Sequence, residues 1–248
     1  MNILLVNDDG FDAPGLKGLK TVLEKYGNVY VVAPITTRSG AGAGLTSFKP
    51  MPYVKVDEKN YKLDGTPVDC VQLSTVLFNT DFDLIVSGCN NGFNISNDTM
   101  YSGTCGGCYQ ALIFEKKAIA FSSDKYPKTL KIAPKKVIDM CEKAFKYILE
   151  NDLLSTSYYL NVNLPTINYE KDNGIKLTKL YRRHSTYKIN ESESSESMIR
   201  INYTHDDITN DDSYDVSAVQ NGYISITPLR LINYSDDDYI DLVNKAKK

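Results

Sequence analysis

The chain has 248 residues, 42% of them hydrophobic, so it can bury a large core in one domain or in a domain with an appendage. The formal net charge of -3 and a pI near 5.5 exclude the basic footprint of proteins that bind nucleic-acid duplexes or anionic membranes. No apolar run approaches the roughly 20 residues that span a bilayer, and no signal peptide is recognisable, so we expect a cytoplasmic protein without a membrane partner.

The first two-thirds of the chain alternates between predicted buried strands and amphipathic helices. Residues 3–6 form an apolar run of strand length, a helical pattern runs from Pro14 to Gly27, and residues 29–33 form a second apolar run. This order predicts a βαβ unit with parallel strands and a right-handed crossover. Further strands are predicted at 84–86, 118–121 and 158–164, and further helices at 109–116 and 137–148. The pattern indicates a layered α/β domain.

The composition changes after about Thr166. Residues 190–215 are rich in Ser, Asp, Glu and Asn, which is typical either of disorder or of a solvated hairpin arm or oligomer contact. Residues 222–229 return to strand chemistry, and 235–248 predict a terminal helix with Ser235 as its N-cap. We therefore expect a Rossmann-like α/β core at 1–177, followed at 178–248 by a hairpin arm, a returning strand and a C-terminal helix packed on the core or on a neighbouring subunit.

The five cysteines are odd in number, and without a signal peptide we expect no disulfide framework. Cys105 and Cys108 have the spacing of half a zinc or redox site. A zinc site would need a second pair or nearby histidines, and the two histidines, His184 and His205, lie far along the chain. Buried, reduced cysteines at the start of a glycine-rich helix are the favoured interpretation.

Polar clusters follow the predicted strands, at the edge where parallel sheets bind ligands. Asp8 and Asp9 follow the first strand, and two carboxylates side by side repel each other unless a cation lies between them. The further oxygen donors are Ser39 after the second strand and Asn90, Asn91 and Asn94 after the third. Such a set suits Mg²⁺ or Mn²⁺ better than zinc. Each residue alone could cap a helix or serve a turn, but three clusters at one edge favour a metal site.

Two glycine-containing segments indicate a phosphate near that cation. The turn around Gly40 can present backbone N–H groups to an anion, and Ser102, Gly103 and Thr104 stand where a helix is predicted to begin. The glycines at 40, 42 and 44 follow the second strand rather than the first, which disfavours a dinucleotide fingerprint.

Six motifs, in order from residue 3 to about 229, resemble those of the SurE family of stationary-phase survival proteins: ILLVNDDGFDAPG, APITTRSGAGAGLT, DGTPVDC, DLIVSGCNNGFN, MYSGTCGGCYQA and GYISITPL. The resemblance implies a metal-dependent phosphatase that acts on nucleoside monophosphates with one divalent ion per subunit, most often Mg or Mn. It also implies a three-layer, Rossmann-like, mostly parallel sheet with helices on both faces. A C-terminal arm exchanged between subunits of a homodimer or homotetramer is implied as well.

Carried onto this chain, the resemblance makes Asp8 and Asp9 the catalytic residues and, with Ser39 and Asn90, the metal ligands. The expected substrate- and phosphate-binding residues are Asn7, Gly40, Ala41, Asn94, Ser102, Gly103 and Thr104. Ile35 and the acidic stretch 191–215 depart from the family pattern. His184 and His205 fall in the variable arm, so we expect neither to act as general acid or base.

Two routes for phosphate removal stay open at this level: attack by a water that the cation positions, or direct attack by Asp8 or Asp9. Two rival functions also exist. A receiver-type signalling domain shares the paired acids, but its phospho-acceptor Asp is missing after residues 84–86, where Ser87, Gly88 and Cys89 stand instead. A nucleotide-binding protein without catalysis is the other alternative.

Overall fold

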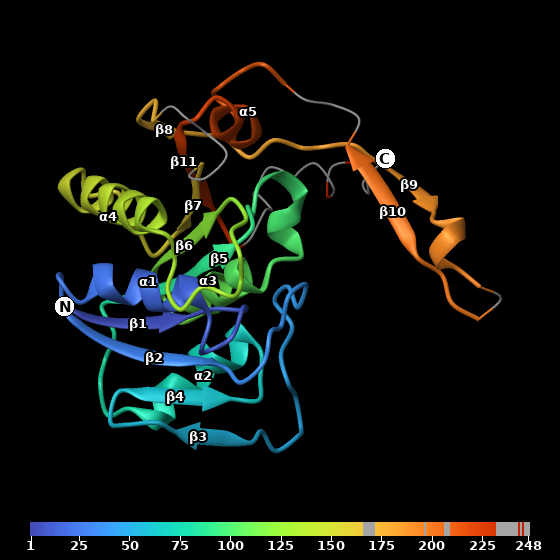
Figure 1. Ribbon diagram of the computed structural model, residues 1–248. Helices are drawn as coiled ribbons and strands as arrows, with labels where there is room; N and C mark the ends of the chain where they lie inside the picture. The colour runs from blue at the N-terminus through green and yellow to red at the C-terminus, as the bar shows by residue number, and fades with distance from the viewer. Residues whose placement is uncertain (166–171, 196, 206–208, 232–242, 244, 246–248) are drawn as a thin grey trace.

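The computed structural model describes residues 1–165, 172–195, 197–205, 209–231, 243 and 245, and its main element is one large sheet (Figure 1). Within these residues, nine strands form the sheet in the order β3-β4-β2-β1-β5-β6-β7-β11-β8. They are β1 (Asn2–Val6), β2 (Asn28–Pro34), β3 (Tyr53–Lys55), β4 (Asn60–Leu63), β5 (Leu84–Asn91), β6 (Lys117–Ser123), β7 (Tyr159–Leu164), β8 (Ile175–Leu177) and β11 (Ile224–Leu229).

The central strands β4-β2-β1-β5-β6-β7 are all parallel, whereas β3 and β11 run antiparallel to their neighbours β4 and β7. Numbered along the chain, these parallel strands have the doubly wound order 3-2-1-4-5-6. The winding direction reverses between β1 and β5. Such a switch point is where open α/β sheets bind their ligands, beyond the carboxyl ends of the strands.

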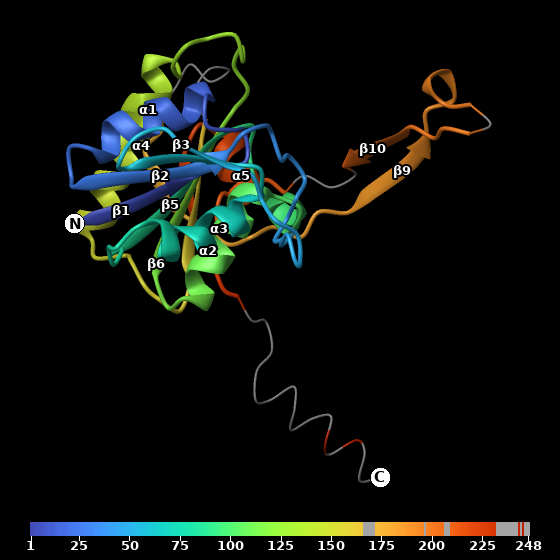
Figure 2. The same cartoon turned by 90° about the horizontal axis from the view of Figure 1, so that it is seen from below.

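Helices cover both faces of the sheet, which confirms the predicted layered α/β fold. The helices are α1 (Pro14–Leu23), α2 (Pro67–Leu77), α3 (Gly103–Ile113), α4 (Lys135–Glu150) and α5 (Asp215–Gln220), with short 3₁₀ helices η1 (Ser96–Met100) and η2 (Glu191–Glu193). α1 and α4 pack on one face, α2 and α3 on the other (Figure 2), and each pair shares a hydrophobic core with the sheet. The strand β1 is buried from Ile3 to Val6 because both faces are covered.

Several elements differ from the periodicity prediction. α1 ends at Leu23, before Gly27, and β5 continues through Asn91, so the polar residues after Val86 lie in the strand rather than in a loop. α2, β3 and β4 were not predicted. α2 begins at a capping box in which Thr66 Oγ1 accepts from the Asp69 N–H and Asp69 accepts from the Thr66 N–H.

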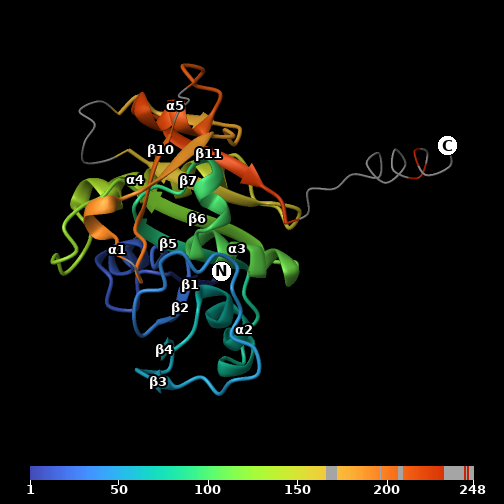
Figure 3. The ribbon, with the colours of Figure 1, turned by 90° about the vertical axis from the view of Figure 1, so that its right-hand side faces the viewer.

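The hydrophilic C-terminal stretch contains ordered structure. β9 (Ser185–Ile189) and β10 (Ile201–His205) pair antiparallel as a hairpin, here called the arm, and α5 follows it. The arm projects from the side at which the central strands end, the side that Figure 3 turns towards the viewer. β11 returns to the main sheet between β7 and β8. Most of the terminal helix predicted at 235–248 lies outside the described residues.

All five cysteines are unpaired and buried. Cys105 and Cys108 belong to the core between α3 and the sheet, where burial raises the pKa of Cys105 to about 11 and raises that of Cys108 as well. Across the described part of the chain, no helix combines the length and apolar character that crossing a membrane requires.

Candidate active site

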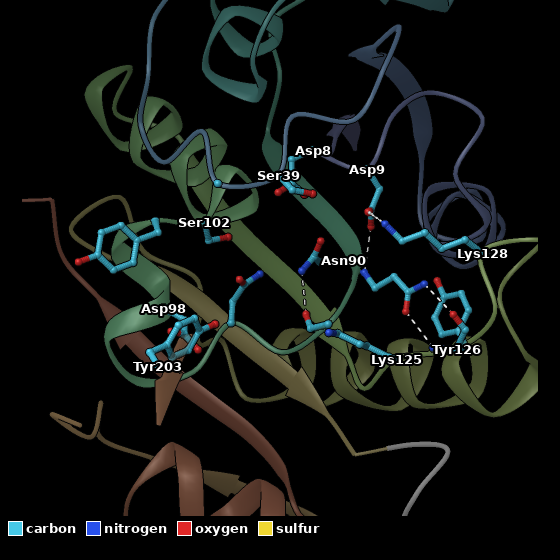
Figure 4. A pocket seen from close by; sticks show the side chains of 15 residues that line it. Asp8, Asp9, Ser39, Asn90, Asp98, Ser102, Lys125, Tyr126, Lys128 and Tyr203 are labelled. Atoms are coloured by element: carbon cyan, nitrogen blue, oxygen red, sulfur yellow. Dashed lines mark hydrogen bonds and ion pairs between the residues drawn. The ribbon is translucent and has the colours of Figure 1, made fainter. Parts of the chain in front are cut away.

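A cavity of about 500 Å³ opens at the carboxyl ends of β1, β5 and β6, at the switch point of the sheet (Figure 4). Eight of the residues singled out from the sequence line it: Asp8, Asp9, Ser39, Gly40, Asn90, Asn91, Asn94 and Ser102. They come from chain segments up to 94 residues apart in number, between Asp8 and Ser102, so the fold brings the polar clusters together as the strand order requires.

Asp8 is the buried carboxylate of the cavity, with 4% of its surface exposed. Thr104 Oγ1, in the first turn of α3, donates to Asp8 Oδ1 over 2.7 Å. Burial raises the pKa of Asp8; the Thr104 hydroxyl lowers it, and the negative charge of Asp9 raises it. The balance leaves the pKa above its ordinary value, with burial as the largest cause.

Asp9 is held from two sides. Its Oδ2 accepts from the backbone N–H of Asn91 over 2.9 Å, and Lys128 Nζ lies 3.6 Å from Oδ1. Asn91 in turn binds the backbone of Tyr126 through both ends of its side-chain amide, at 2.9 Å each. The second carboxylate is thereby fixed between the end of β5 and the loop that follows β6.

Asn90 and Ser39 complete an oxygen-rich wall. Asn90 Nδ2 donates to the Gly92 carbonyl over 2.7 Å, which leaves the amide oxygen on the side that faces Asp8 and Ser39 (Figure 4). The bend of β5 that brings Asn90 there depends on Gly88, which has φ 131° and lies so close to Phe121 that a Cβ would be 2.3 Å from its carbonyl oxygen.

The donor set fits a hard divalent cation. Two carboxylates, a hydroxyl and an amide oxygen are ligands that Mg²⁺ and Mn²⁺ prefer, and a cation would offset the repulsion that helps to raise the pKa of Asp8. No group of three or more His, Cys, Asp or Glu in the described residues is arranged to hold a metal. A cation in this cavity would therefore rely on Ser39 and Asn90 as well as on the two acids.

Ser102 and Asn94 form the opposite side of the cavity. Ser102 caps α3, with its Oγ accepting from the Cys105 N–H over 3.2 Å. Asn94 is held by two buried asparagines of β7: its carbonyl accepts from Asn161 and Asn163, and its N–H donates to Asn163 Oδ1. The alternating asparagines of β7 were not singled out in the sequence, although polar residues inside a buried strand are a sign of such a role.

Four predicted phosphate-binding residues do not line the cavity: Asn7, Ala41, Gly103 and Thr104. Asn7 closes the turn after β1 by bonding both backbone groups of Gly10. The N–H of Ala41 donates to the Arg38 carbonyl over 3.1 Å, so it is engaged in a local turn. These contacts place both residues in chain turns, and their role in phosphate binding stays a prediction.

Gly103 and Thr104 lie against Asp8 instead. A Cβ on Gly103 would be 2.9 Å from Asp8 Cβ, and Thr104 binds the carboxylate directly. Both therefore bring the start of α3 close to the acid and support Asp8, and their role in phosphate binding stays a prediction.

Several cavity residues were not predicted from the sequence. Lys125, Tyr126 and Lys128 come from the loop after β6, Asp98 and Tyr101 from η1 and its end, and Tyr203 from the arm. The loop after β6 could have been found, because β6 is a parallel neighbour of β5 and its carboxyl end faces the same edge. No comparable signal exists for Tyr203. His184 is exposed ahead of β9, outside the lining of the cavity.

Comparison with known proteins places this geometry in a family. A family model described as Survival protein SurE matches residues 3–187. A protein named 5'-nucleotidase SurE from Actinobacillus succinogenes is 37% identical over 236 residues, covering 93% of this chain and 92% of the relative. Another of that name, from Aquifex aeolicus, is 36% identical over 233 residues, covering 92% and 91%.

The crystal structure of a SurE protein from Aquifex aeolicus is similar to the whole fold, with a TM-score of 0.81, 32% sequence identity and 100% of both chains covered. Because the family model and these relatives match most of its length, the chain belongs to the SurE family.

Proposed function

We propose that this protein is a metal-dependent phosphatase that hydrolyses nucleoside monophosphates to nucleoside and phosphate. The observation that carries the proposal is the pair Asp8 and Asp9, facing Asn90 and Ser39 in a cavity at the switch point of the sheet. The relatives named 5'-nucleotidase SurE support the same reaction and substrate class.

One Mg²⁺ or Mn²⁺ ion per subunit would be held by Asp8, Asp9, Ser39 and Asn90. Bound there, the cation would neutralise charge on the phosphoryl oxygens and lower the pKa of a water molecule. Asp8 supplies a carboxylate that Thr104 orients, and Asp9 supplies one that the Asn91 N–H orients.

Four further cavity residues would bind the phosphate: Asn94, Ser102, Lys125 and Lys128. Ser102 presents a hydroxyl at the start of the 11-residue helix α3, whose N-terminus favours negative charge. Asn94 is fixed by β7, and Lys125 and Lys128 add two positive charges at the mouth. These groups would hold the ester in line with an attacking oxygen.

The attacking oxygen belongs either to water or to one of the two aspartates. The stereochemistry at phosphorus distinguishes these routes. Direct attack by water is one displacement and inverts the configuration of an isotopically chiral phosphate ester, whereas attack by Asp8 or Asp9 followed by hydrolysis of the aspartyl phosphate is two displacements and retains it.

The reaction is tested by phosphate release from a panel of nucleoside monophosphates with Mg²⁺, Mn²⁺ or EDTA. We expect release that needs the metal and falls about 100-fold or more in Asp9→Asn, because several kcal/mol of charge stabilisation is lost. Asp81→Asn is the matched control, since Asp81 forms an exposed ion pair with Lys116 before β6. No release by the folded protein with either metal would favour the binding or signalling alternatives instead.

We further propose a homodimer or homotetramer in which the arm contacts a neighbouring subunit. The arm stands off the body and carries exposed apolar residues: Tyr187, Ile189, Met198, Ile199 and Ile201. Replacing residues 187–203 by a short turn should lower the mass measured by light scattering. An unchanged mass would refute the proposed contact.

A further inference from the structure

A second cavity of about 300 Å³ adjoins the one that holds the two carboxylates. The two cavities share Asp98, Tyr101 and Tyr203. The second continues along η1 to Arg183 and to the start of the arm, where Ser185 and Tyr187 line it. A molecule with its phosphate beside Asp8 and Asp9 can therefore extend in one direction into a further pocket.

Asp98 stands where the two cavities meet. Its side chain is 43% exposed, and Arg183 Nη1 lies 3.7 Å from its Oδ2. The Arg183 side chain is only 10% exposed, so the Asp98 carboxylate is paired with a nearly buried positive charge that favours one orientation. An ionised carboxylate accepts hydrogen bonds only, and the vicinal hydroxyls of a ribose are donors that it can bind in pairs.

The other two shared residues are aromatic. Tyr101 comes from the end of η1 and Tyr203 from β10, and they are 65% and 60% exposed. The ring of Tyr203 lies 6.2 Å from that of Tyr187 across the arm, so two aromatic rings stand at this wall. Exposed aromatic rings stack on nucleic-acid bases with little preference for which base, because every base has a π-face.

The wall between these residues is held in place by hydrogen bonds between distant segments. Asn97 Nδ2 donates to the Arg183 carbonyl over 2.6 Å, and the Arg183 N–H donates to Ser96 Oγ over 3.1 Å. The buried carboxylate of Asp215 accepts from the N–H groups of both Ser96 and Tyr181. η1, the segment before the arm and α5 are thus tied together, which gives a pre-formed pocket.

We propose that the second cavity is the nucleoside subsite: Asp98 binds the ribose hydroxyls, and Tyr101 and Tyr203 stack on the base. This inference rests on the proposed phosphatase function and adds the residues that select the substrate. It also assigns a role in recognition to the arm, which supplies Tyr203. Arg183 is a positioning residue that acts through Asp98.

The subsite is tested by comparing adenosine monophosphate, its 2'-deoxy analogue and ribose 5-phosphate as substrates. Tyr101→Ala and Tyr203→Ala should lower kcat/KM for adenosine monophosphate roughly 5- to 100-fold, chiefly through KM, and affect ribose 5-phosphate far less. Asp98→Asn should lower kcat/KM more for adenosine monophosphate than for the 2'-deoxy analogue. Tyr53→Ala is the control, because Tyr53 is equally exposed, at 60%, on the edge strand β3.

Equal losses on adenosine monophosphate and ribose 5-phosphate, or no loss in either tyrosine variant, would overturn the subsite. Failure of the wild type to hydrolyse any ester would instead overturn the phosphatase proposal. Adenosine binding measured by saturation-transfer NMR tests the subsite independently of turnover. If the wild type binds adenosine and Tyr203→Ala does not, the subsite is supported even without turnover. If the wild type does not bind adenosine, the subsite is refuted.

Discussion

The hydrogen bond from Thr104 to Asp8 should increase the affinity of the site for a cation, because it orients the carboxylate. Thr104 is fully buried, and its Oγ1 lies 2.7 Å from Asp8 Oδ1. Thr104→Val keeps the shape and removes the donor. A hydrogen bond to a charged group contributes about 1.5–3 kcal/mol, and loss of an outer partner of a metal ligand typically weakens affinity about 10- to 100-fold. We expect the Kd for Mn²⁺ to rise by that factor.

The same substitution should change the pH dependence of binding. The Thr104 hydroxyl lowers the pKa of Asp8, against burial and the charge of Asp9, so its removal raises that pKa further. A cation binds the ionised carboxylate, and protons compete with it more strongly as the pH falls. The loss of affinity should therefore be larger at pH 6 than at pH 8.

Isothermal titration calorimetry with Mn²⁺ at both pH values measures the effect. Thr178→Val is the matched control, because Thr178 is also buried and bonded to the hydroxyls of Ser225 and Thr227, away from the cavity. A Kd within about twofold of the wild type at both pH values would refute the reasoning, since the expected change is about 10- to 100-fold.

Three further substitutions test contacts that build the site. Gly106→Ala places a Cβ 2.1 Å from the Gly42 carbonyl oxygen. We therefore expect the free energy of unfolding, measured in urea, to fall by about 1–3 kcal/mol, and phosphate release to become slower. Gly107→Ala should have a smaller effect, because its Cβ would meet nothing nearer than 3.1 Å. Asp69→Ala removes a buried carboxylate that accepts from two backbone N–H groups, at 2.8 and 2.9 Å. The free energy of unfolding in urea should fall by about 3 kcal/mol, and a loss no larger than that of an exposed Asp→Ala substitution would contradict this. Burial raises the pKa of Asp215 above 3.8, so the folded protein keeps this proton to higher pH than the unfolded chain. The stability of the wild type relative to Asp215→Asn should then fall as the pH rises from about 4, and a constant difference in urea unfolding between pH 4 and 7 would exclude the effect.

The central strands were predictable because a strand buried on both faces reads as a continuous apolar run, as residues 3–6 do. α2 was not predicted from periodicity, because the sheet and α3 bury much of its surface and its apolar residues follow no single stripe. The local signal was the capping box at Thr66 and Asp69, which depends on side-chain hydrogen bonds rather than on hydrophobic period.

The metal-binding candidates could be predicted because the positions of the strands were predictable. Asp8, Ser39 and Asn90 follow or end strands, and strand order alone brings such positions together. Asp98 lies in η1, beyond the end of β5, and Tyr203 lies in β10 of the arm, outside the main sheet. Their placement depends on contacts such as that of Asp215 with Ser96, 119 residues away in the chain, which no local pattern encodes.

The position of Tyr203 on the arm separates the residues that would recognise the base from the residues that would hydrolyse the ester. The two acids directly follow β1, a strand that the core must keep, whereas Tyr203 lies on a hairpin whose exposed side chains contribute little to that core. Under the proposed subsite, base preference can drift or be redesigned by substitutions in the arm while the hydrolytic groups stay unchanged. A mutant library confined to β10 and η1 is therefore the economical route to a nucleotidase with a chosen substrate.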